Sequence, residues 1–118
     1  MGARKKSIWM SYDLGLKGNY NSLFTFLDNH KAKDCGNGLA YFEYENPESL
    51  DAEALIEKLK TELATIIEPS SNDRVYVIWR DDSTTLAAIK GKFLFGRRKS
   101  APWNGYGTTN ENQSDEAI

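Results

Sequence analysis

Residues 7–14, SIWMSYDL, decide how the fold begins. Large apolar side chains alternate there with side chains that are, apart from Trp9, small or polar. This period of two is typical of a β-strand with two different faces. A glycine-containing stretch, GLKGN, follows directly, and a helical pattern comes after it. Asp13 is therefore expected at the carboxyl end of a first strand, beside a loop, where α/β folds often place chemistry.

The rest of the chain alternates between amphipathic helices and strands. Apolar residues three and four positions apart predict helices over residues 20–31 and 47–69. Asn19 or Asn21 is expected to cap the first helix, and Pro47 to open the second. Further strands are expected at residues 39–45, 74–80, 84–89 and 93–96. A bulge or tight turn at residues 90–92, KGK, is expected between the last two.

This order of elements predicts an α+β domain. Two amphipathic helices each need an apolar surface, and an antiparallel sheet with both helices on one face provides it. A ferredoxin-like two-layer sandwich, with the order β-α-β-β-α-β, requires one more strand, which a short strand at residues 32–35 would supply. Residues 93–96 would then form an extra C-terminal strand. The domain is expected at residues 7–99, after a flexible basic lead-in at residues 1–6 and before a partly disordered polar tail at residues 100–118.

Composition excludes several classes of protein. The 118 residues fit one domain, and an apolar content of 40% is enough for a core. The net charge of −2 excludes a polycation that binds nucleic acid through its overall charge. A single cysteine and a single histidine exclude an intrachain disulfide and a Cys/His zinc cluster. No apolar run approaches the length of a membrane span, so a reducing cytoplasmic setting without a membrane partner is expected.

Asp13 has two interpretations. An aspartate before a glycine-containing turn commonly accepts hydrogen bonds from its own loop. A carboxylate is also a ligand that Mg²⁺ prefers, so the alternative to this structural role is that Asp13 is a catalytic and metal-binding residue. The residues alone leave both interpretations open.

Two surfaces of the predicted sheet are candidates for binding. Five basic residues late in the chain are candidates for nucleic-acid binding, or alternatively a charged edge that prevents aggregation: Lys90, Lys92, Arg97, Arg98 and Lys99. The sheet face without helices carries Trp9 and other aromatic residues, which indicates contact with a second subunit or with bases. The residues proposed for such an interface are Trp9, Phe93, Phe95 and Trp103.

Two short motifs carry a resemblance to a known family. They are the opening strand with Tyr12-Asp13 and the stretch DRVYVIW at residues 73–79. Together with the order of elements over residues 7–99, they resemble the small CRISPR-associated Cas-two nuclease superfamily, which includes Cas-two-like proteins and the virulence-associated D-type toxin ribonucleases. The resemblance implies a ferredoxin-like fold and a homodimer in which residues 93–96 add to the partner's sheet.

The resemblance also implies a role for Asp13. It corresponds to the family's aspartate at the end of the first strand, and two copies across the dimer axis would hold a divalent metal, Mg²⁺, for phosphodiester hydrolysis. Family members usually continue with an arginine-rich entry to the first helix, whereas GLKGNYNS here carries only Lys17. This difference favours a non-enzymatic dimeric module that binds nucleic acid or a protein partner. The alternative is a metal-dependent endonuclease or toxin ribonuclease that uses paired Asp13 residues.

Overall fold

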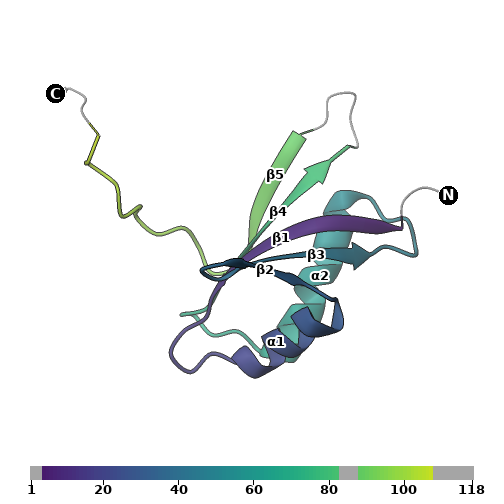
Figure 1. Ribbon diagram of the computed structural model, residues 1–118, viewed down its shortest axis with the longest axis horizontal. Helices are drawn as coiled ribbons and strands as arrows, with labels where there is room; N and C mark the ends of the chain where they lie inside the picture. The colour runs from purple at the N-terminus through teal and green to yellow at the C-terminus, as the bar shows by residue number, and fades with distance from the viewer. Residues whose placement is uncertain (1–3, 83–87, 108–118) are drawn as a thin grey trace.

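The computed structural model describes residues 4–82 and 88–107 as a mixed α+β domain (Figure 1). In chain order its elements are β1 (Lys5–Asp13), α1 (Tyr20–Asn29), β2 (Lys33–Gly36), β3 (Leu39–Glu45), α2 (Ala52–Ile67), β4 (Arg74–Asp81) and β5 (Ala88–Phe95). Neither helix in this part of the chain is long and apolar enough to span a membrane.

The strands form one five-stranded sheet in the order β2-β3-β1-β4-β5, and every neighbouring pair is antiparallel. β1 lies at the centre, between β3 and β4. It begins at Lys5, so the last two residues of the expected lead-in belong to the sheet. The additional strand expected at residues 32–35 is present as β2, shifted by one residue. After β5 the chain extends away from the sheet (Figure 1).

The core confirms the alternation predicted for the strands. Ile8 and Met10 of β1 are fully buried, whereas Trp9 between them is 38% exposed. α1 and α2 contact each other and contribute to the same apolar cluster as the sheet. The largest fully buried side chains in this cluster are Trp79, Phe42, Ile8, Met10, Leu23, Leu55, Ile56, Leu59, Leu63, Val75 and Val77.

The second helix begins later than Pro47. The side chain of Asn46 accepts a hydrogen bond from the N–H of Leu50 at 2.9 Å and donates one to the Leu50 carbonyl at 3.0 Å, which holds the intervening residues in a turn. Asp51 then caps the helix by accepting from the N–H of Ala54 at 2.9 Å. α2 therefore starts at Ala52, because capping by Asp51 outweighs the preference of proline for a first helical turn.

The C-terminal strand is continuous where an interruption was expected. Residues 90–92 belong to β5, and the irregularity lies at Leu94, because Tyr76 pairs with Phe93 while Val75 pairs with Phe95. Leu94 is thus the extra residue of a bulge, and its side chain is buried. Gly91 has a different role, since a Cβ there would collide with the Tyr76 hydroxyl. Of the strand predicted at residues 84–89, positions 84–87 lie outside the described residues.

A buried aspartate joins two connections that are distant in sequence. Asp73 precedes β4 and is 3% exposed. Its Oδ1 accepts a hydrogen bond from the N–H of Gly15 at 2.6 Å, and its Oδ2 accepts from the N–H of Ser70 at 2.9 Å. The carboxylate therefore fixes the end of β1 relative to the start of β4.

Replacing Asp73 tests this junction. Asp73→Ala leaves the Gly15 and Ser70 N–H groups without their acceptor, so we expect the free energy of unfolding to fall by about 2–4 kcal/mol in urea denaturation. The control is Asp82→Ala, because Asp82 is exposed and its ion pair with Arg80 lies on the surface. A loss below about 1 kcal/mol is expected there. Equal, small losses in both variants would contradict a structural role for Asp73.

Candidate functional site

Four cationic side chains gather where β4 begins and β5 ends. Arg74, Arg97, Arg98 and Lys99, here called the basic corner, line a depression of about 450 Å³ together with Ser71, Asn72 and Gly96. Three of them come from the segment after β5 and one from the first position of β4. Their common position is therefore a product of the sheet, because the β4–β5 pairing brings the two ends together.

Glycine is required at the turn into the basic corner. Gly96 has a φ of +78°, and a Cβ on it would lie 2.6 Å from the carbonyl oxygen of Asp73. A side chain at this position would meet both backbone strain and a steric clash. Gly96 thus lets the chain pass close to Asp73 and directs the following basic residues toward Arg74.

A second, smaller depression adjoins the basic corner. It measures about 190 Å³ and is lined by Ser11, Asp13, Arg74, Tyr76, Phe93 and Arg98. Arg74 donates from Nη2 to Oδ2 of Asp13 at 3.4 Å. The Arg98 guanidinium lies 5.5 Å from the centre of the Tyr76 ring and 5.4 Å from that of Phe93, within cation–π range.

The structure places Asp13 in an ion pair. Its side chain is 65% exposed, and no hydrogen bond from its own loop reaches it within residues 4–82 and 88–107. The loop N–H of Gly15 is instead accepted by Asp73, so the prediction that Asp13 caps the loop is wrong. Sequence reasoning missed Asp73, because its partner Gly15 is 58 residues away. In the described part of the chain, no three His, Cys, Asp or Glu residues are grouped to hold a metal ion.

Two of the five predicted nucleic-acid-binding residues lie on the other face of the sheet. Lys90 and Lys92 pair in register with the buried Trp79 and Val77, and so share the face that carries the core. Lys90 Nζ lies 3.0 Å from Oδ2 of the buried Asp81, whose hydrogen bond and charge raise the pKa of Lys90. The strand alternation therefore separates these lysines from Arg98.

Lys92 also forms an ion pair with a carboxylate. Its Nζ donates to Oε2 of Glu57 on α2 at 2.5 Å, and this hydrogen bond lowers the pKa of the Glu57 carboxyl. The pair links the edge of the sheet to the helix layer. Arg97, Arg98 and Lys99 remain as the predicted basic residues that the structure brings to one depression, and Arg74 is an addition that the sequence did not single out.

The sheet face opposite the core, here called the open face, carries aromatic rings. Trp9 contacts Tyr41 with ring centroids 4.9 Å apart, and Tyr76 contacts Phe93 with centroids 4.6 Å apart. All four come from alternate positions of neighbouring strands, and Trp9 is the most exposed of them. This face therefore combines apolar area with the Asp13–Arg74 pair at one end.

The four proposed interface residues lie in different environments. Trp9 and Phe93 lie on the open face. Phe95 packs against the hydrophobic core, because the bulge at Leu94 reverses the alternation and sets Phe95 opposite the buried Val75. Trp103 lies in the segment after β5 and is 73% exposed.

Comparison with known proteins adds no relative. The chain matches no protein-family model, no curated protein and no solved structure. Geometry and chemistry of the described residues are therefore the basis for a functional proposal.

Proposed function

We propose that the protein is a small cytoplasmic, Cas-two-like homodimer that binds the phosphate backbone of nucleic acid without catalysing a reaction. The observation that carries this proposal is the basic corner, in which Arg74, Arg97, Arg98 and Lys99 surround one depression. Guanidinium groups present several N–H donors in a plane that matches phosphate oxygens. The Ser71 and Asn72 side chains beside them are further hydrogen-bonding groups of the kind that contact phosphates.

The distribution of charge supports a local electropositive site. The chain carries a net charge of −2, yet the basic corner contains four cations. Of the two carboxylates beside it in the described part of the chain, Asp13 pairs with Arg74, and the buried Asp73 accepts the N–H groups of Gly15 and Ser70. The Asp13–Arg74 pair is long, at 3.4 Å, and exposed, so solvent weakens it. Phosphate oxygens can therefore compete for Arg74 at modest cost.

The topology is compatible with the family that the sequence resembles. The order β-α-β-β-α-β followed by β5, with β1 between β3 and β4, supports a ferredoxin-like sandwich with an added edge strand. Burial of apolar residues of both helices in one cluster with alternate strand residues supports placing both helices on one sheet face. β5 pairs with β4 of its own chain, so exchange of this strand between subunits is not part of the proposal.

The proposed dimer buries the part of the open face around Trp9. Trp9 is 38% exposed there beside Tyr41, Ile78 and Tyr76, an apolar area that a second copy would remove from water. A two-fold axis through this face places two basic corners on one particle. Two phosphate-binding sites on one rigid body bind a polynucleotide more tightly than either alone.

The alternative function is a metal-dependent endonuclease or toxin ribonuclease. It is favoured by the position of Asp13, which is exposed on the open face and would approach its copy in the proposed dimer. Two carboxylates with water and phosphate oxygens would suffice for Mg²⁺. Arg74 opposes it, because its guanidinium lies 3.4 Å from the Asp13 carboxylate and would repel a metal ion there.

Charge removal at the basic corner tests the proposed function. Arg97→Gln combined with Arg98→Gln is expected to weaken binding of fluorescein-labelled DNA and RNA oligonucleotides at least about tenfold at low salt, because two phosphate contacts are lost. The slope of log K against log salt should fall by about 2. Fluorescence anisotropy across a salt series measures both quantities.

The matched control is Lys58→Gln combined with Lys60→Gln on α2, which removes the same charge far from the corner in sequence. It is expected to bind as the wild type does. Equal weakening in both double variants would contradict a localised site. Mg²⁺-dependent cleavage of the oligonucleotides that disappears in Asp13→Ala would replace the proposed function by the nuclease alternative.

The dimer has a separate test. Trp9→Lys places a charge in the middle of the proposed interface, so size-exclusion chromatography with light scattering should show the wild type at twice the 13.3 kDa chain mass and the variant at that mass. Leu16→Lys is the control, since Leu16 is fully exposed in the connection after β1. A monomeric wild type, or a Trp9→Lys variant that remains dimeric, would contradict the proposed interface.

A further inference from the structure

The outer edge of β3 is only partly covered. β2 pairs with β3 from Leu39 to Tyr41, where Lys33 is the last partner, whereas β3 continues to Glu45. Within the described residues, no strand lies outside positions 43–45. This end of β3 therefore presents a free strand edge.

The hydrogen-bond pattern of β1 and β3 identifies which backbone groups are free. Tyr12 donates to the carbonyl of Gly38, and Asn46 donates to that of Arg4. In an antiparallel ladder, hydrogen-bonded pairs recur at every second residue, so the even-numbered residues of β3 direct their N–H and C=O groups toward β1. Glu43 and Glu45 direct theirs outward, and no backbone hydrogen bond to either is present among the described residues.

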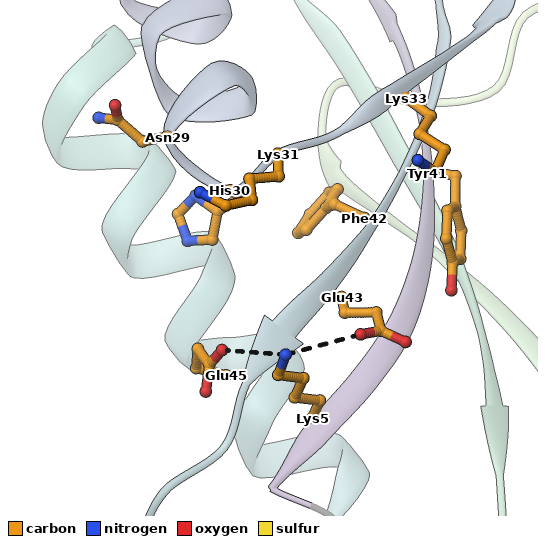
Figure 2. Close-up of a pocket in the computed structure, with 9 residues that line it drawn as sticks. All are labelled: Lys5, Asn29, His30, Lys31, Lys33, Tyr41, Phe42, Glu43 and Glu45. Atoms are coloured by element: carbon orange, nitrogen blue, oxygen red, sulfur yellow. Dashed lines mark ion pairs between the residues drawn. The ribbon is translucent and has the colours of Figure 1, made fainter.

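These outward groups open into a groove. The groove measures about 590 Å³, and its walls are formed by the end of α1 on one side and by β3 and β1 on the other. Figure 2 shows the His30 ring on the helix side of this space, with Lys5, Glu43 and Glu45 on β1 and β3 across from it. A volume of this size holds a few residues of extended chain, and an exposed strand edge is a template for pairing with another chain.

The two faces of the sheet offer different surroundings to a strand in this groove: charged groups on the open face and apolar groups on the helix side. In a strand added beside β3, the residues opposite Glu43 and Glu45 would point their side chains to the open face. There the ammonium of Lys5 lies 3.8 Å from the carboxylate of Glu43 and 3.8 Å from that of Glu45, so these three groups together carry one negative charge in excess. Lys31 and Lys33 lie at the end nearest β2, so the preference for a basic residue is strongest opposite Glu45.

The intervening residue would point to the helix side. Its neighbours there are Phe42 and Tyr44, both buried, and the His30 ring, whose centroid lies 5.8 Å from the centroid of each. His30 Nδ1 lies 2.8 Å from the carbonyl of Phe26, and this contact holds the ring in place. An apolar side chain would fill this position with the least loss of hydration.

We propose that this groove binds an extended peptide of a partner protein, which adds a strand to β3 through Glu43 and Glu45 and carries basic residues on either side of an apolar one. Backbone pairing supplies the affinity and the two faces supply the selectivity. The site is independent of the basic corner, which lies where β4 begins and β5 ends.

Peptide backbone chemistry gives the decisive test. The probe is a fluorescein-labelled peptide with Lys-Val-Lys at its centre, measured by anisotropy against the full chain. N-methylation of either lysine nitrogen removes a donor to β3, and binding should weaken about tenfold. N-methylation of the valine nitrogen, which points away from β3, is the matched control and should leave binding unchanged. Equal effects of the two methylations, or no binding of the unmodified peptide, would overturn the proposal.

A charge exchange provides a second test. Glu45→Lys should reverse the preference, so that a peptide with Glu-Val-Glu binds more tightly than the one with Lys-Val-Lys. The control is Glu68→Lys, which changes an exposed glutamate after α2 and should keep the wild-type preference. An unchanged preference in Glu45→Lys, with the fold intact by circular dichroism, would contradict strand addition at this edge.

Discussion

The buried carboxylate of Asp73 is the interaction on which the site depends. It binds the N–H groups of Gly15 and Ser70 and so fixes the end of β1 beside the start of β4. The Asp73 carbonyl in turn packs against Gly96, where only a glycine can pass. Three connections distant in sequence thereby meet at one point, and the basic corner is the surface of that junction. A charged group buried for this purpose needs all its hydrogen bonds, because an unsatisfied one would cost more than the fold gains.

The alternation of side chains along the strands then places basic residues with different roles on opposite faces of the sheet. Lys90 and Lys92 take the face of the helices, where Asp81 and Glu57 bind them and where they tie the edge of the sheet to the core. Arg98 takes the open face, where it lies over two aromatic rings and has no carboxylate partner among the described residues. Cations that stabilise the domain are thus distinct from cations that are available to a ligand. Two further surfaces are available to partners in the proposals made above: the open face for a second copy of the chain, and the free edge of β3 for a peptide.

Local patterns predicted most of the fold. The alternation of Ile8 and Met10 with other, mostly small or polar residues identified β1, and the apolar run at residues 75–79 identified β4. The late start of α2 was missed because the side chain of Asn46 competes with proline for the local backbone. The bulge at Leu94 was also missed, since a register shift is set by the partner strand, and it turns Phe95 from the open face toward the core.

The site was predicted only in part, for the same reason. Its basic residues after β5 are visible as a cluster in the sequence, but Arg74 joins them only through strand pairing. The division of the lysines from the arginines requires the register, and the role of Asp73 requires a contact across 58 residues. Sequence patterns reveal which face a residue takes within a strand, whereas they do not reveal which strand ends meet.

Backbone hydrogen exchange with and without a bound oligonucleotide tests the central claim most directly, because it locates the contact surface without altering any residue. The account predicts that added protection concentrates at residues 72–74 and 96–99, around the junction that Asp73 forms. Protection confined to α2 or to the outer edge of β3, with residues 96–99 unchanged, would contradict it.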